Sequence, residues 1–303
     1  MFMSSKLRIA FIGLDSSHCT AFTDLLQAES DPIFASAAVT VGWPGGSPDF
    51  PMSRDRVEGF TAEMRDRGVR IVESPEDAVS SADAIILGCV DGRQHLEIAR
   101  RLMPFQKPMF VDKPLAHDSA AARQLAKELD AAGVPWFTSS ALRFQEPLPT
   151  LLSDPDRGAI LGCDVHGIWR HGPGHSDLAW YGIHGIEALF TVMGPGCQQV
   201  QRVSAENGDV VIGQWSGGRI GTWRGLKFDH QATGYGLTVF CRHAIRQIPV
   251  PADYDGLVRE IVRFFQTLKP PVSSRETLEI FAFMDASERS RDLGGQVVPV
   301  EIG

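Results

Sequence analysis

The first 142 residues alternate short apolar runs with amphipathic stretches, and this alternation restricts the possible folds more than any other feature of the chain. The apolar runs are typical of buried parallel strands. The stretches between them carry helix start signals such as Ser74-Pro75-Glu76-Asp77, with an N-cap, a proline and two acids in order. Strands that alternate with helices predict right-handed crossovers and a doubly wound parallel sheet. The predicted strands cover residues 7–12, 37–41, 69–72, 84–87, 108–111 and 134–138.

The pattern changes after about Leu142, where longer segments with alternating apolar residues begin. Turn signals at Asn207-Gly208 and at 216–218 separate these segments, which predicts antiparallel strands that bury one face. Apolar residues at helical spacing predict a helix over 254–268. The predicted fold class is therefore α/β, with a Rossmann-type parallel sheet domain over 1–142 and an α+β domain with a mainly antiparallel open sheet over 143–303. The cleft between two such domains is the default ligand pocket.

Charge and composition exclude several classes of protein. The formal net charge of -8 argues against a nucleic-acid partner, and no apolar segment has the length of a membrane span. The start Met1-Phe2-Met3-Ser4-Ser5-Lys6 lacks the apolar core of a signal peptide, so we expect a cytoplasmic protein. The five cysteines are scattered and odd in number, which favours reduced thiols.

A lysine follows the fifth predicted strand directly. Ligands in open α/β sheets bind beyond the carboxyl ends of the strands, which is where Asp112 and Lys113 are delivered. Pro114 disfavours the helical region for Lys113 and so restricts the direction of its side chain. This position makes Lys113 a candidate catalytic residue.

The first strand ends in the turn Gly13-Leu14-Asp15-Ser16-Ser17-His18. A dinucleotide fingerprint, Gly-x-Gly-x-x-Gly, needs glycine at its second and third conserved positions, where this chain has Asp15 and His18. We expect a carboxylate at Asp15 to repel a pyrophosphate, while Ser16 and Ser17 can donate hydrogen bonds to one. The acid that usually holds the ribose after the second strand is also missing, since Gly42-Trp43-Pro44 stands there.

Two motifs and the order of elements resemble the Gfo/Idh/MocA family of NAD(P)-dependent oxidoreductases over essentially the whole chain. The first motif is Asp112-Lys113-Pro114-Leu115-Ala116, where the family usually has Glu-Lys-Pro. The second is Gly182-Ile183-His184-Gly185-Ile186-Glu187, in which Glu187 replaces the family's last aspartate, while Trp180 replaces its first. The resemblance implies NAD or NADP as cofactor, a sugar, cyclitol or related polyhydroxylated substrate, and a homodimer or homotetramer.

The resemblance also implies roles for individual residues. Lys113 and His184 would be catalytic, with the ammonium stabilising negative charge on the substrate oxygen and the imidazole moving the proton. Cofactor-binding residues would be Gly13, Leu14, Asp15, Ser16, Ser17, Cys89, Val90, Asp91, His95, Asp112, Lys113 and Pro114. Substrate-binding residues would be Lys113, Arg143, His171, His175, Trp180 and His184. Trp180 would leave His184 less well supported, although its indole can stack on a sugar ring.

Two other functions remain open. The broken fingerprint and Trp180 are also compatible with a dehydrogenase-like protein that binds a sugar or nucleotide without turnover. A metal-dependent enzyme is a further alternative, because His166, His171, His175 and His184 lie close together in the sequence, with Asp164 and Asp177 among them. We expect no metal, since glycine-rich loops of this kind more often bind hydroxyls or solvent. His18 either packs against its loop or lies near the cofactor or substrate.

Overall fold

The computed structural model describes residues 6–28, 31–227, 234–251 and 253–302. Met1 to Ser5, which contributed to the prediction that no signal peptide is present, lie outside the described residues. Contacts between Cα atoms group the chain into two compact units, residues 1–139 with 257–273 and residues 140–256 with 274–303. The sequence analysis predicted a single domain boundary between residues 142 and 143. It did not anticipate that residues 257–273 pack with the first unit.

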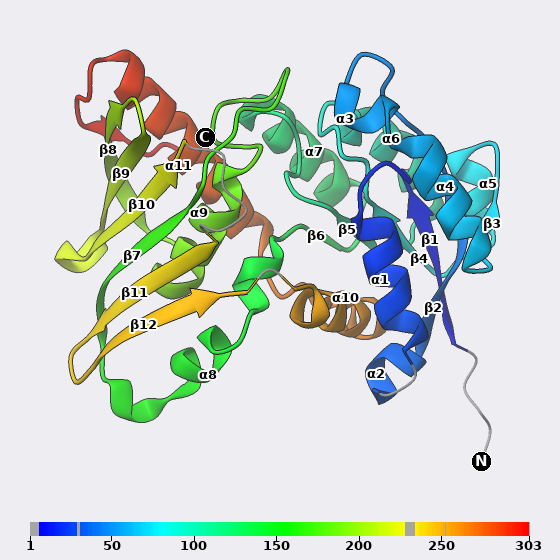
Figure 1. Cartoon of the computed structure of the whole chain (residues 1–303), viewed down its shortest axis with the longest axis horizontal. Coiled ribbons are helices and arrows are strands. Elements are labelled where there is room, and N and C mark those ends of the chain that lie inside the picture. The colour runs from blue at the N-terminus through cyan, green and yellow to red at the C-terminus, as the bar shows by residue number, and fades with distance from the viewer. Residues whose placement is uncertain (1–5, 29–30, 228–233, 252, 303) are drawn as a thin grey trace. The chain divides into compact units, whose positions relative to one another are not determined.

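The first unit is built on a parallel sheet, as the alternating pattern predicted (Figure 1). Its described residues form six strands in the order β3-β2-β1-β4-β5-β6. The chain moves outward from β1 to β3 and then returns to β4 on the other side of β1, so the strand order reverses between β1 and β4. Ligands of doubly wound sheets bind at this kind of reversal, at the carboxyl ends of the strands. The strands are β1 Leu7–Ile12, β2 Ala37–Trp43, β3 Arg70–Ile71, β4 Ala84–Leu87, β5 Met109–Val111 and β6 Trp136–Phe137.

Helices connect these strands, and their starts follow local capping rules. The Ser74 side chain accepts a hydrogen bond from the Asp77 N–H at 3.1 Å, which confirms the predicted N-cap. Asp118 caps the next long helix in the same way, at 2.7 Å from the Ala121 N–H. The helices are α1 His18–Gln27, α2 Pro32–Ala35, α3 Pro51–Arg54, α4 Val57–Asp66, α5 Pro75–Ser80, α6 His95–Leu102, η1 Met103–Phe105 and α7 Ser119–Ala131.

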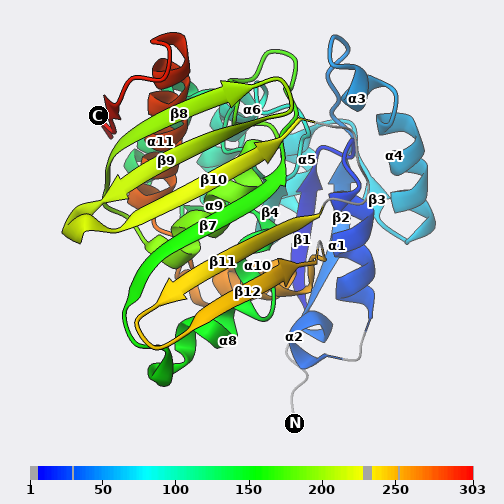
Figure 2. The ribbon, with the colours of Figure 1, turned by 60° about the vertical axis from the view of Figure 1, so that its left-hand side comes forward.

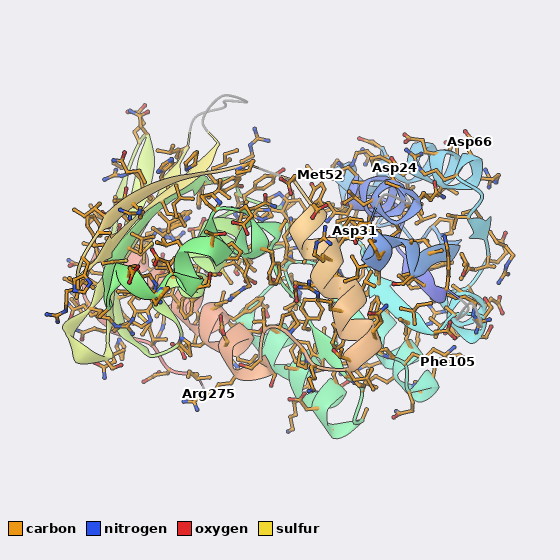
Figure 3. All side chains as sticks on the ribbon, turned by 90° about the horizontal axis from the view of Figure 1, so that it is seen from below. Asp24, Asp31, Met52, Asp66, Phe105 and Arg275 are labelled. Carbon is orange, nitrogen blue, oxygen red and sulfur yellow. The ribbon has the colours of Figure 1, made fainter. Side chains whose placement is uncertain are left out.

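Helix α10, Asp255–Thr267, lies mostly in the first unit although it follows the second sheet in sequence. Its apolar stripe is buried, and Phe264 meets Phe137 of β6 edge-on with ring centroids 4.9 Å apart. Arg259 forms an ion pair with Asp31 at the start of α2 and lies over the Phe34 ring (Figure 3, where Asp31 is labelled). Apolar packing and this ion pair together explain why the segment belongs to the first unit.

The second unit contains a sheet that is mostly antiparallel, as predicted. Seven strands are present in its described part, in the order β12-β11-β7-β10-β9-β8-β13. One pair of strands differs from the predicted antiparallel arrangement. Strand β10 runs parallel to β7, while it is antiparallel to β9. The strands are β7 Ile160–Ile168, β8 Cys197–Ala205, β9 Gly208–Trp215, β10 Ile220–Leu226, β11 Tyr235–Cys241, β12 Ile245–Val250 and β13 Val298–Pro299.

Two long helices, α9 Gly182–Met193 and α11 Ser274–Asp292, lie on one face of this sheet (Figure 2). Gly185 allows α9 to approach the sheet, since a Cβ there would lie 2.5 Å from Nε1 of Trp223 on β10. This close packing fixes the helix that carries His184. The shorter helices of the unit are η2 Ala141–Phe144, α8 Leu148–Ser153, η3 Pro155–Arg157 and η4 Ser216–Gly218. Among the described residues of both units, no helix has the length and apolar character needed to cross a bilayer.

Candidate active site

The turn after β1 is packed tightly between the ends of two neighbouring strands. Gly13 has φ +93°, and a Cβ at this position would lie 2.4 Å from Sγ of Cys89 and 2.6 Å from its backbone nitrogen. On the other side, the N–H groups of Gly13 and Leu14 donate to the carbonyl oxygens of Trp43 and Pro44 at 2.9 and 2.8 Å. Position 13 therefore requires glycine for both its conformation and its close approach to the loop after β4.

Asp15, at the second fingerprint position, is fully buried. One carboxyl oxygen accepts a hydrogen bond from the Val90 N–H at 2.9 Å, and the other accepts one from the Ser53 hydroxyl at 2.6 Å. Burial raises the pKa of this carboxyl, which favours its neutral form. Asp15 thus joins the turn to α3 and to the loop after β4. A neutral carboxyl repels a phosphate less than the carboxylate that we expected at Asp15 from the sequence.

The start of α1 offers hydrogen-bond donors. Ser17 is exposed, whereas Ser16 is buried and its hydroxyl oxygen accepts the His18 N–H at 3.3 Å. Within the described residues, the backbone N–H groups of Ser16 and Ser17 have no acceptor. Such N–H groups at the start of a helix are suitable donors to an anion.

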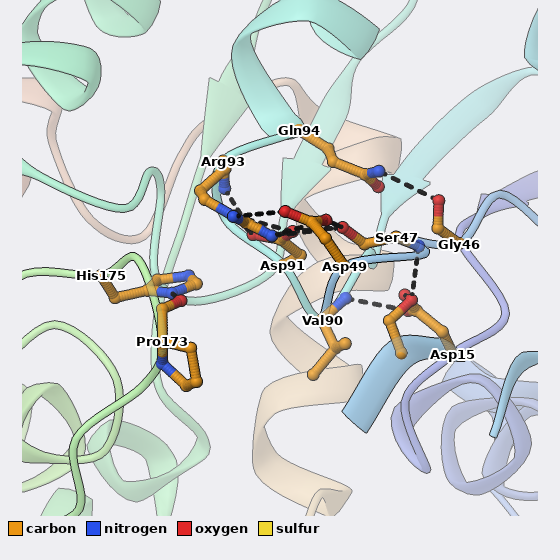
Figure 4. A network of polar contacts seen from close by, with 11 residues as sticks. Asp15, Gly46, Ser47, Asp49, Val90, Asp91, Arg93, Gln94, Pro173 and His175 are labelled. Atoms are coloured by element: carbon orange, nitrogen blue, oxygen red, sulfur yellow. Dashed lines mark hydrogen bonds and ion pairs between the residues drawn. The ribbon is translucent and has the colours of Figure 1, made fainter. Parts of the chain in front are cut away.

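A charged network joins the loop after β2 to the loop after β4 (Figure 4). The Ser47 hydroxyl donates to buried Asp91 at 2.6 Å, and the Arg93 guanidinium binds Asp91 at 2.7 Å and Asp49 at 3.0 Å. Hydrogen bonds from Arg93 and Ser47 hold the pKa of Asp49 below its ordinary value. The sequence analysis proposed Asp91 for this site but missed Ser47, Asp49 and Arg93. The dinucleotide fingerprint covers only the turn after β1, so it does not indicate contacts between the loops after β2 and β4.

His95 is completely buried between two loops. Its Nδ1 lies 3.1 Å from the carbonyl oxygen of Leu115, and its Nε2 lies 2.9 Å from that of Cys89. The imidazole therefore links the loop after β4 to the segment that follows Lys113. In this structure His95 holds the shape of the site, and its predicted contact with a cofactor would be indirect.

Lys113 follows β5, next to a buried acid. Asp112 accepts the Lys113 N–H at 2.9 Å and lies 2.5 Å from Nδ1 of His18. Burial alone would raise the pKa of Asp112, but the His18 and Lys113 groups outweigh it and lower that pKa. Burial lowers the pKa of Lys113, and the Asp112 carboxylate partly opposes this effect. The peptide bond between Lys113 and Pro114 is cis.

His184 lies in the first turn of α9. Its Nδ1 is 2.8 Å from the hydroxyl of Ser140, a buried residue that also accepts the Leu142 N–H. The rings of Tyr181 and Tyr235 lie 5.9 and 5.8 Å from the imidazole, edge to face. A hydroxyl group therefore orients this histidine, where the family resemblance implied a carboxylate at position 180.

Trp180 and His175 pack against each other within one loop. Trp180 is 5% exposed, and its ring lies so close to Gly172 that a Cβ there would be 2.6 Å away. The ring centroids of Trp180 and His175 are 4.8 Å apart, and Nδ1 of His175 donates to the Pro173 carbonyl at 3.1 Å. His171 is exposed in the same loop. The indole is thus largely covered by its own loop, which leaves little surface for stacking on a sugar.

Arg143 is buried and bound to two carboxylates. Its Nε donates to Glu187 of α9 at 2.9 Å, and its Nη1 donates to Glu276 of α11 at 2.7 Å. The guanidinium therefore joins η2 to both long helices of the unit. These contacts give Arg143 a structural role in addition to the predicted role in substrate binding.

The histidines between 166 and 184 do not converge. His175 and His184 have the separate partners described above, and His166 is exposed on β7. Among the residues that the structure describes, no three His, Cys, Asp or Glu side chains are grouped closely enough to hold a metal ion.

The described residues thus form a doubly wound parallel sheet with a lysine after β5, followed by a mixed sheet with two long helices on one face. No protein-family model matches the chain, and no curated protein matches it. Solved structures do match over nearly its whole length. GenD2 from gentamicin A biosynthesis, solved in complex with NAD, is 16% identical, with a TM-score of 0.77 over 99% of this chain and 98% of that one.

Two other solved structures have the same fold. Myo-inositol dehydrogenase from Lactobacillus casei, in complex with NAD(H) and myo-inositol, is 14% identical, with a TM-score of 0.76 over 98% of both chains. The WlbA dehydrogenase from Bordetella pertussis, in complex with NADH and UDP-GlcNAcA, is 18% identical, with a TM-score of 0.73 over 98% of this chain and 99% of that one. At these identities the likeness shows the fold, and it confirms the predicted α/β architecture.

Proposed function

We propose that this protein is an NAD(P)-dependent oxidoreductase of the Gfo/Idh/MocA type. It transfers a hydride between a nicotinamide cofactor and a CH–OH group of a sugar, a cyclitol or a related polyhydroxylated molecule. The main support is the match, over nearly the whole chain, to dehydrogenases solved with NAD or NAD(H), two of them with myo-inositol or UDP-GlcNAcA. Fold alone does not determine function, so the proposal also depends on the residues at the carboxyl ends of β1 and β5.

The turn after β1 fits a pyrophosphate despite the missing glycines. Gly13 provides the tight turn, and in this proposal the N–H groups of Ser16 and Ser17, which have no acceptor among the described residues, donate to the phosphate oxygens. Both carboxyl oxygens of Asp15 are already hydrogen-bonded inside the unit. Trp43 offers no carboxylate to the ribose, so we expect the phosphate contacts to supply more of the affinity than they do in fingerprint-bearing dehydrogenases.

In this proposal Lys113 and His184 are the catalytic residues, and the reacting atom of the substrate is the oxygen of its CH–OH group. A bound nicotinamide would accept or donate the hydride. The Lys113 ammonium stabilises the negative charge that develops on the oxygen, and the His184 imidazole accepts or returns the hydroxyl proton. The Ser140 hydroxyl at Nδ1 orients the ring so that Nε2 is the atom that exchanges the proton.

The substitution Lys113→Ala tests this assignment. We expect turnover to be abolished while NADH affinity, measured by nicotinamide fluorescence, stays within about threefold of the parent, because the ammonium is used mainly in the transition state. Exposed Lys127→Ala on α7 is the matched control and should leave both quantities unchanged. An active Lys113→Ala variant would refute the assignment.

A second candidate function is binding of a sugar or nucleotide without turnover. The direct network between the loops after β2 and β4, together with Trp43 in place of the ribose acid, favours it. Titration of the purified protein with NADH and NADPH separates the two functions. Failure of both cofactors to bind at millimolar concentration would support the binding protein and contradict the oxidoreductase.

We also propose that the protein is a cytoplasmic homodimer or homotetramer. Val203 and Ile220, on β8 and β10 of the second sheet, are 55% and 51% exposed, which is consistent with an apolar contact surface. Light scattering coupled to size-exclusion chromatography would measure the mass in solution, and a monomer at micromolar concentration would contradict this part of the proposal.

A further inference from the structure

His18 stands at the third fingerprint position, where a dinucleotide-binding turn would have glycine. Its side chain does not simply pack against its own loop. Nδ1 lies 2.5 Å from the carboxylate of Asp112, the residue that follows β5. Since β4 lies between β1 and β5 in the sheet, this contact links the two turns that flank the loop after β4.

We propose that His18 is a positioning residue for Lys113 and acts on it through Asp112. The inference rests on the proposed function, in which the Lys113 ammonium is catalytic. It assigns to position 18 a role that glycine could not fill.

Every group between His18 and Lys113 is held in place. The His18 ring stacks on Phe22, with centroids 5.1 Å apart and planes 17° from parallel, and its backbone N–H donates to Ser16. Asp112 is 4% exposed, and its two oxygens have different partners, His18 Nδ1 and the Lys113 N–H. The carboxylate therefore cannot rotate without losing a hydrogen bond in a buried site, where an unsatisfied polar group is unfavourable.

The same contacts also affect the ionisation of Asp112 and Lys113. The His18 group favours the ionised form of Asp112 against the effect of burial. Ionised Asp112 in turn favours the ammonium form of Lys113, which burial and the positive charge of Arg56 both disfavour. Loss of the His18 donor should therefore let Asp112 take up a proton and should make the Lys113 amine neutral at a lower pH.

The reactivity of Lys113 toward an amine-acylating reagent tests the inference without cofactor or substrate. Labelling of the Lys113 peptide is followed by mass spectrometry across a range of pH, since only the neutral amine reacts. His18→Phe keeps the ring stack but removes the donor, and Asp112→Asn removes the charge. We expect both to speed Lys113 labelling at least about threefold at pH 8, equivalent to half a pKa unit. His18→Gln, which retains an N–H donor, should stay close to the parent.

His117→Phe is the matched control, because His117 is also paired with an aspartate, Asp118, at 3.2 Å. Its removal should leave the labelling of Lys113 unchanged. Circular dichroism and the melting temperature establish that each variant is folded. If His18→Phe does not fold, Asp112→Asn and His18→Gln decide the question. A folded His18→Phe or Asp112→Asn variant that labels like the parent at every pH would overturn the inference.

The outcomes also separate this inference from the proposed function. Faster labelling of Lys113 in His18→Phe, with no nicotinamide-dependent turnover in the parent, would support the positioning role and count against the oxidoreductase. Normal turnover and an unchanged kcat profile against pH in His18→Phe would overturn the positioning role and leave the oxidoreductase intact. A shift of the basic limb of the kcat profile to lower pH in His18→Phe, with no such shift in His18→Gln, would support both the positioning role and the oxidoreductase.

Discussion

The hydroxyl of Ser140 lies 2.8 Å from Nδ1 of His184, although the two residues are 44 positions apart. Ser140 is completely buried, and its oxygen also accepts the Leu142 N–H at the start of η2. The imidazole is therefore oriented by a group whose own position is fixed by the backbone. This contact replaces the carboxylate that the resemblance places at position 180, where the chain has Trp180.

Replacement of Ser140 by alanine should impair the orientation of His184. We expect kcat to fall about fivefold with little change in KM, because a hydrogen bond worth about 1 kcal/mol is lost at the group that moves the proton. Steady-state kinetics of Ser140→Ala and Ser140→Thr would check this, since threonine keeps the hydroxyl. A kcat for Ser140→Ala equal to that of the parent would show that the contact has no catalytic role.

The pH dependence of activity should reflect the burial of Lys113. Burial lowers its pKa below the value of 10.5 that an exposed lysine has. A step that needs the ammonium is supported below the lowered pKa and lost as the pH rises through it. We therefore expect kcat/KM to decline on the basic side at a pH below 10.5, and to decline at still lower pH in Asp112→Asn. A profile that stays flat up to pH 10.5 would contradict the assignment of Lys113.

The ion pairs of Arg143 predict a large effect on stability. Its partners include Glu187, which is 2% exposed, so Arg143→Met would leave a buried carboxylate without its counter-charge. The free energy of unfolding should fall by about 3 kcal/mol in urea denaturation, and Glu187→Gln should restore part of the loss in the double variant. Arg54→Ala, which breaks the exposed pair with Asp55, should be indistinguishable from the parent. If Arg143→Met and Arg54→Ala lowered the free energy of unfolding by similar amounts, burial would not determine the cost of breaking an ion pair in this protein.

Local sequence signals were sufficient for most of the first sheet. The run that ends at Val111 and the acid, lysine and proline after it defined β5 and the place of Lys113, because a buried strand and its following turn are both local patterns. The N-cap at Ser74 could be predicted for the same reason. Strands β3 and β6 are shorter than predicted, since edge strands pair on one side only.

The contacts that shape the candidate site could not be predicted in this way. His18 and Asp112 are 94 positions apart, and a motif identifies position 18 as a missing glycine without indicating where a longer side chain points. The buried orientation of Asp15 depends on Ser53 and Val90, which come from two other segments. Similarly, the apolar stripe of α10 predicts a helix but does not specify which unit it packs against.

The turn at Gly13 offers a test of close packing that is separate from backbone strain. An added Cβ would lie 2.4 Å from Sγ of Cys89 and 2.7 Å from its Cα, and the φ of +93° is itself unfavourable for alanine. Gly68 has a similar φ of +82°, but a Cβ added there would have no atom of the described residues within 4 Å. Gly68→Ala should therefore lower the free energy of unfolding by about 1 kcal/mol, from the conformation alone.

Gly13→Ala should lower the free energy of unfolding by about 3 kcal/mol, because overpacking against the loop after β4 adds to the same unfavourable backbone conformation. It should also weaken NADH binding, since the turn and the loop that carries Val90 would have to move apart and the N–H groups of Ser16 and Ser17 would move with the turn. Urea denaturation measures the first effect and fluorescence titration the second. Equal losses of stability in the two variants would mean that the approach of Gly13 to Cys89 does not constrain this turn.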